Sequence, residues 1–163
     1  MDDPGEEIGR VKGEIRSAFT HVLPPDPERL LDRGRWPGEA KALRGLRRDG
    51  WRHWWEVPPD VPDRNHEALV LLAPEALRFY LPGFMTLALD RHDSGSPPVG
   101  LLLVVLTPGD KPAAWKAFEA RFGNLDGPQR GAVASFLRLW RDRPGEDLDA
   151  NQARIALERY WGP

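Results

Sequence analysis

The segment DGPQRGAVASFLRLW, residues 126–140, contains the clearest evidence for the fold class. Asp126 can cap a helix, the proline two positions later suits the first helical turn, and Gln129 stands where a capping box needs its amide. Apolar residues then recur at steps of three or four, which is the period of one face of an α-helix. These residues are Val133, Phe136, Leu137 and Trp140. The segment therefore predicts an amphipathic helix.

The same spacing appears on both sides of this segment. Residues 6–22 carry an apolar stripe, and a second capping pattern, from Asp149 to Gln152, precedes another stripe near the C-terminus. In 74–89 the stripe contains Pro82, which predicts a kink or a break near Leu81 because proline lacks the N–H donor and clashes with the preceding turn. We expect an all-α fold, a compact irregular bundle of about six or seven helices in a single domain, residues 1–163. The expected helices are 6–22, 37–48, 65–72, 74–89, 99–106, 126–140 and 149–161, with a loop at 51–62.

The apolar run 99–106 leaves one alternative open. A buried strand and a buried helix look alike at this length. A lone strand needs a partner, and no second convincing strand is present, so we favour a helix. If 99–106 were a strand, the fold would be α+β. The run is also far shorter than the ~20 residues that a membrane-spanning helix needs.

Composition narrows the functional classes. The 163 residues include no cysteine, which excludes disulfides, thiolate metal sites and a cysteine nucleophile. The formal charge of −2 argues against a surface built throughout for nucleic acid. Nineteen of the 23 basic residues are arginine, a bias typical of GC-rich bacterial genomes. The acidic start, Met1 to Pro4, is followed by no apolar stretch, so we expect a cytoplasmic protein without a membrane partner.

Two short elements resemble a known family. They are Trp54-Trp-Glu-Val57-Pro58, of the form W-x-x-[IV]-P, and Arg78-Phe-Tyr-Leu-Pro-Gly-Phe-Met85, of the form R-[FY]-Y-L-P-x-[FY]-[ML]. In these elements the chain resembles a bacterial family of small proteins of unknown function, mainly over 54–89 and 118–161. The resemblance implies a mostly helical bacterial domain. It carries no activity, substrate or catalytic residue.

The densest chemical feature is the Arg/Trp segment, residues 33–55. Trp and Arg dominate protein interfaces because both bury large rigid area and Arg adds forked hydrogen bonding. Basic residues interleaved with aromatic ones also suit single-stranded nucleic acid. The third interpretation is structural, with packed tryptophans and a solvated arginine face. We expect interaction residues at Trp36, Arg44, Arg47, Arg48, Trp51, Arg52, Trp54 and Trp55, and burial of all four tryptophans would contradict this.

Evidence for catalysis is weak by comparison. No nucleotide-binding loop, nucleophile elbow or metal-ligand pattern is present, so we expect no catalytic residue, cofactor or metal. His66 follows Asp63 by three positions, but Asp63 fits a helix cap better than a metal ligand. The expected function is non-enzymatic, through binding of a protein, as an adaptor, regulator or toxin-neutralising partner. The alternative is an enzyme of unrecognised type with a pocket near His66, Tyr80 and Pro82.

Overall fold

The computed structural model describes residues 3–31, 46, 51–92, 97–144 and 147–162. In these residues it contains seven α-helices and no sheet, apart from an isolated bridge between Leu31 and Leu72, which confirms the all-α prediction. The α-helices are α1 (Pro4–Ala18), α3 (Asp60–Arg64), α4 (Pro74–Asp90), α5 (Pro97–Val105), α6 (Pro112–Phe122), α7 (Gly127–Arg141) and α8 (Leu148–Ala156). Tighter turns are η1 (Pro27–Arg29), η3 (Trp54–Glu56) and η4 (His66–Val70), and a π-helical turn, η5 (Leu157–Trp161), follows α8.

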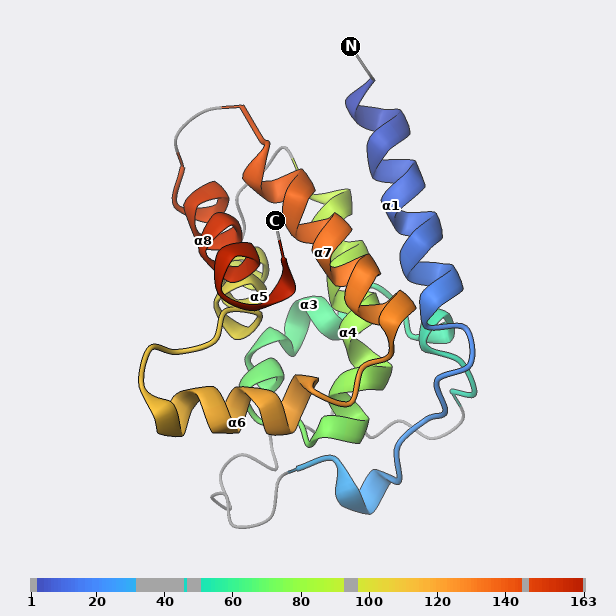
Figure 1. Cartoon of the computed structure of the whole chain (residues 1–163). Helices are drawn as coiled ribbons and strands as arrows, with labels where there is room; N and C mark the ends of the chain where they lie inside the picture. The colour runs from blue at the N-terminus through green and yellow to red at the C-terminus, as the bar shows by residue number, and fades with distance from the viewer. Residues whose placement is uncertain (1–2, 32–45, 47–50, 93–96, 145–146, 163) are drawn as a thin grey trace.

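Helix α7 lies in the middle of the bundle, with α1 along one side and α8 on the other (Figure 1). Its predicted capping box is confirmed: a carboxylate oxygen of Asp126 accepts the Gln129 N–H at 2.9 Å, and the Gln129 amide oxygen accepts the Asp126 N–H at 3.1 Å. Phe136 and Trp140 are completely buried. The local sequence therefore determines both where α7 begins and which face it buries.

Helix α4 passes through Pro82 as one helix, so of the kink or break expected here, the break is not found. Proline removes the N–H that would bond to the carbonyl four residues earlier. Downstream, the Thr86 hydroxyl donates to the Pro82 carbonyl at 2.8 Å. Most α4 side chains are buried in the core, and we attribute the survival of the helix to this packing.

Several further local expectations are corrected or decided. The run 99–106 is almost entirely within α5, so the α+β alternative is wrong. The expected loop 51–62 contains η3 and the start of α3, and α6 was not predicted at all. Helix α8 is capped by Asp147, whose carboxylate accepts the Ala150 N–H at 2.7 Å, rather than by Asp149. The expected helix 37–48 lies outside the described residues, except for Leu46.

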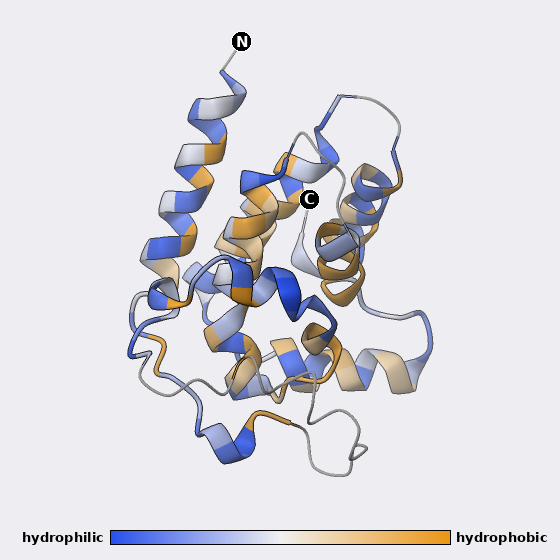
Figure 2. Cartoon of the chain, turned by 180° about the vertical axis from the view of Figure 1, so that it is seen from behind, coloured by the Kyte–Doolittle hydropathy of each residue, from blue (hydrophilic) through white to orange (hydrophobic). Residues whose placement is uncertain are grey.

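Buried side chains from α1, α4, α5, α6, α7 and η5 form a continuous hydrophobic cluster. Apolar residues face the interior of the bundle, and polar residues cover the outer faces of α1 and α8 (Figure 2). None of the helices in the described ranges is both long enough and apolar enough to cross a bilayer.

Candidate functional site

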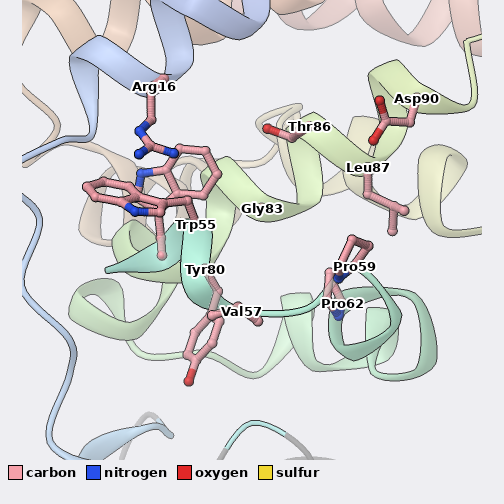
Figure 3. Close-up of a pocket in the computed structure, with 11 residues that line it drawn as sticks. Arg16, Trp55, Val57, Pro59, Pro62, Tyr80, Gly83, Thr86, Leu87 and Asp90 are labelled. Carbon is pink, nitrogen blue, oxygen red and sulfur yellow. The ribbon is translucent and has the colours of Figure 1, made fainter. Parts of the chain in front are cut away.

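A cavity of about 210 Å³ lies between the segment 54–62 and helix α4 (Figure 3). Helix α1 contributes one side chain to it, at the edge. Most of the wall is apolar or aromatic, and the ionisable side chains are few. The lining residues are Arg16, Trp54, Trp55, Val57, Pro59, Pro62, Tyr80, Gly83, Thr86, Leu87 and Asp90.

The turn η3 is closed by Glu56. Its carboxylate accepts the backbone N–H groups of Arg52 at 2.7 Å and His53 at 3.2 Å. These two hydrogen bonds favour the ionised form and lower the pKa of Glu56 below its ordinary value. The closed turn orients the two consecutive tryptophans: Trp54 points into the core and is 6% exposed, while Trp55 is half-buried and lies nearly perpendicular to it.

Trp55 is held between two side chains. The guanidinium carbon of Arg16 lies 3.5 Å from the centroid of the Trp55 ring, and the His53 ring stacks on Trp55 with centroids 4.3 Å apart and planes at 2°. Two groups this close to the same centroid would overlap if they shared a face, so they cover opposite faces of the indole. Arg16 hangs from α1 toward the tryptophans (Figure 3). A cation over an indole is a favourable electrostatic contact.

Tyr80 contributes its ring to the cavity but directs its hydroxyl away from the Arg16 and Asp90 ends (Figure 3). That hydroxyl donates to the Leu46 carbonyl at 2.7 Å. Burial disfavours the phenolate and raises the pKa of Tyr80 to about 12. Tyr80 is therefore a neutral structural tether to Leu46 at neutral pH.

The two ends of the cavity carry opposite charges, Arg16 at one and Asp90 at the other (Figure 3). Asp90 pairs with Lys12 of α1. In the described residues, by contrast, no carboxylate forms an ion pair with Arg16. Within the described part of the chain, the positive end of the cavity therefore has no acidic counter-charge.

The structure joins two sets of residues that the sequence analysis kept apart. Trp54 and Trp55 of the Arg/Trp segment meet Tyr80 of the second element in one cavity, whereas His66 and Pro82 do not line it. Trp51 is half-buried and Arg52 is exposed, so partial exposure remains at Trp51 and Trp55. Trp36, Arg44, Arg47 and Arg48 lie outside the described residues. The sequence does not single out Arg16 or Gly83, because each is an ordinary helix residue until the fold brings them together. Asp90 stands out in the sequence only as part of the charged run 90–93, which is typical of a solvated surface.

Asp63 does not cap a helix, contrary to expectation. It lies inside α3, and its carboxylate accepts two hydrogen bonds from the Arg91 guanidinium, at 2.7 and 2.8 Å. His66 is nearby, with its Nδ1 atom 2.9 Å from the Asp63 carbonyl oxygen. No group of three or more metal-binding side chains lies together in the part of the chain that the structure describes.

The Asp63–Arg91 pair predicts a pH-dependent contribution to stability. Bonding to Arg91 lowers the pKa of Asp63 below its ordinary value of 3.8. A carboxyl with a lowered pKa stabilises the fold above its unfolded-state pKa and loses this contribution as the pH falls through the folded pKa. Asp63→Asn is therefore expected to destabilise the protein by up to about 1 kcal/mol at neutral pH and by progressively less as the pH falls below 3.8.

Urea unfolding of the wild type, Asp63→Asn and the control Asp60→Asn at several pH values measures this difference. Asp60 lies on the same short helix and is exposed. A destabilisation by Asp63→Asn that stays constant from neutral to acidic pH would contradict the prediction.

Comparison with known proteins identifies the family of the chain but assigns it no activity. No curated protein and no solved structure matches the chain. The model of one family, described as a family of unknown function (DUF6714), matches residues 12–163, which include every residue that lines the cavity. The chain therefore belongs to this family of unknown function, DUF6714.

Proposed function

We propose that the protein is a non-enzymatic binding protein of the bacterial cytoplasm, which recognises another protein by taking one apolar side chain of that partner into the cavity between the segment 54–62 and α4. The observation that supports this most is the cavity itself: an apolar wall containing two tryptophans, with charge only at its ends. Interfaces commonly anchor on buried aromatic and apolar pockets bordered by polar groups.

The ionisable groups of the cavity favour binding over catalysis. General acid–base chemistry needs a group whose pKa lies near the working pH and whose proton can reach the reacting atom. The pKa of Tyr80 is raised to about 12, and its hydroxyl donates a hydrogen bond to the Leu46 carbonyl. Asp90 pairs with Lys12, and Arg16 remains charged. The Thr86 hydroxyl donates to the Pro82 carbonyl at 2.8 Å and not to the Asp90 carboxylate.

The size of the cavity favours a side chain over a cofactor. Sites for drug-sized ligands typically enclose about 300–1,000 Å³, and this cavity encloses about 210 Å³. A single anchor residue is a better match to this volume. The surrounding segment 54–62 then provides the surface over which the rest of the partner lies.

Trp54 and Trp55 give little support to the binding of single-stranded nucleic acid. Binding of this kind requires ring faces on which bases can stack. Both faces of Trp55 are covered, by Arg16 and His53, and Trp54 is buried. A protein partner does not need these faces, because the indoles form the wall of the cavity and do not have to stack with a ligand.

Filling the cavity tests the proposal. A Cβ atom at Gly83 meets nothing within 4 Å and Gly83 lines the cavity, so we expect the side chain introduced by Gly83→Leu to extend into it. A random peptide library displayed on phage and selected on the wild-type protein should yield peptides that share an apolar residue. We expect these peptides to bind Gly83→Leu at least about tenfold more weakly than the wild type. A decrease of this size is expected when one anchor residue can no longer enter its pocket.

Gly131→Leu is the matched control. Gly131 also lies inside a helix and is exposed, and a Cβ atom there likewise meets nothing within 4 Å, but Gly131 does not line the cavity. Both substitutions replace a helix-interior glycine, which favours the helix by up to about 1 kcal/mol, so neither should unfold the protein. Equal peptide binding by the two variants, or no enriched peptide, would contradict the proposed function.

A further inference from the structure

We infer that the partner segment places an acidic side chain, aspartate or glutamate, against Arg16, next to the apolar residue that fills the cavity. This inference rests on the proposed function and adds the chemistry of the partner to it. Three observations support the inference: the position of Arg16, the stacking of its guanidinium on Trp55, and the charges of the neighbouring side chains.

The Arg16 guanidinium is fixed before any partner arrives. It projects from the last turn of α1 and lies 3.5 Å from the Trp55 centroid and 5.9 Å from that of Trp54. Trp55 is itself supported on its other face by His53. A long side chain that is already stacked loses less conformational freedom when it binds, so more of the interaction energy appears as affinity.

Stacking leaves the hydrogen-bonding edge of the guanidinium available. The five N–H donors of arginine lie in the guanidinium plane, whereas the contact with the indole uses its face. A carboxylate can accept two parallel N–H bonds from one edge, and this charge-assisted arrangement is the strongest that arginine forms. The Arg16 residue is exposed, so a ligand can reach that edge from outside.

The cations of α1 differ in whether they already have an acidic partner. Arg10 lies 2.5 Å from Glu14 and 3.6 Å from Glu7, and Lys12 pairs with Asp90. Among the residues that the structure describes, Arg16 forms no such pair. Of these three cations, the one without an acidic partner is therefore the one that lines the cavity.

The opposite end of the cavity sets the orientation of the partner. The carboxylate of Asp90 at that end already pairs with Lys12, so an acidic side chain of the partner is attracted more strongly to the Arg16 end (Figure 3). A side-chain carboxylate fits better than a chain terminus because Arg16 lies at the edge of the cavity, where a continuous segment can pass across the surface. Capture of a terminal carboxylate typically uses a nest of backbone N–H groups, and the described lining offers side chains instead.

The test uses an array of short peptides with leucine at the centre and aspartate, glutamate, asparagine, glutamine or lysine at each flanking position in turn. At one flanking position, the wild-type protein should bind the peptide with the acidic residue about tenfold more tightly than the peptide with the corresponding amide. A tenfold difference in affinity is expected for one charge-assisted hydrogen-bonded pair. Arg16→Gln should bind the two peptides equally. Arg10→Gln, which changes the net charge identically, should keep the acidic preference.

The outcomes separate this inference from the proposed function. If Gly83→Leu weakens binding of the whole array but the wild type shows no acidic preference, or if Arg16→Gln keeps that preference, the inference is wrong and the proposed function stands. If Gly83→Leu does not weaken the binding of any peptide that the wild type binds, or if the wild type binds no peptide, the inference and the proposed function are both wrong. Raising the salt concentration should reduce the acidic preference, because the pair forms near the surface.

Discussion

Trp140→Ala is expected to lower the free energy of unfolding by about 3–5 kcal/mol, a large share of the roughly 5–15 kcal/mol that holds a domain of this kind together. Trp140 is completely buried in α7. Its ring contacts His92, with centroids 5.0 Å apart, and Phe136 at 6.4 Å, and the Arg143 guanidinium lies 5.3 Å away. Alanine removes these contacts and leaves a cavity at the centre of the bundle.

Chemical denaturation followed by circular dichroism measures this loss, because the signal from the helices does not depend on the tryptophan removed. Trp115→Ala is the control: Trp115 lies on α6 and is 38% exposed, so its replacement should have a much smaller effect. Similar destabilisation by the two substitutions would show that Trp140 is not a central core residue.

Trp161→Phe is expected to destabilise the protein by about 1–3 kcal/mol more than Trp140→Phe does. Both tryptophans are buried, but they differ in hydrogen bonding. The indole N–H of Trp161 donates to the Leu106 carbonyl at 2.7 Å, whereas the indole N–H of Trp140 has no acceptor among the residues that the structure describes. Phenylalanine at 161 leaves a buried carbonyl without a donor, while phenylalanine at 140 removes a donor that was already unsatisfied.

The comparison of these two phenylalanine variants largely cancels the loss of ring size, which is common to both. The difference between their free energies of unfolding therefore reports the hydrogen bond. A difference near zero would mean that water satisfies the Leu106 carbonyl in Trp161→Phe, and the hydrogen bond would then contribute little.

Sequence patterns predicted best those features that depend on neighbouring residues. The start of α7 follows from Asp126 and Gln129, which are three positions apart and bond to each other in the structure. The prediction that Trp140 and Trp161 are core residues is confirmed for the same reason, because helical periodicity alone places them on the apolar face. Helix α6 was missed since it is largely exposed, although Pro112 at its start resembles the prolines that begin α1, α4 and α5.

The candidate site could be predicted only in part, since it depends on tertiary contacts. Trp54, Trp55 and Tyr80 stood out because of their residue types. The stacking of Arg16 on Trp55 joins residues 39 positions apart (55 minus 16), and no local pattern encodes such a contact. Glu56 was missed for a different reason: its hydrogen bonds to residues 52 and 53 are local, but the prolines that follow it suggested an irregular loop.

The Pro82-Gly83 pair at the middle of α4 also has a consequence for the order of folding. Two such residues disfavour a helix by about 4 kcal/mol relative to two alanines. Helix α7, in contrast, begins with a capping box and can form from its own sequence. We therefore expect α7 to be helical early and α4 to become helical only as the core assembles around it. The wall of the cavity would then be among the last parts of the protein to form.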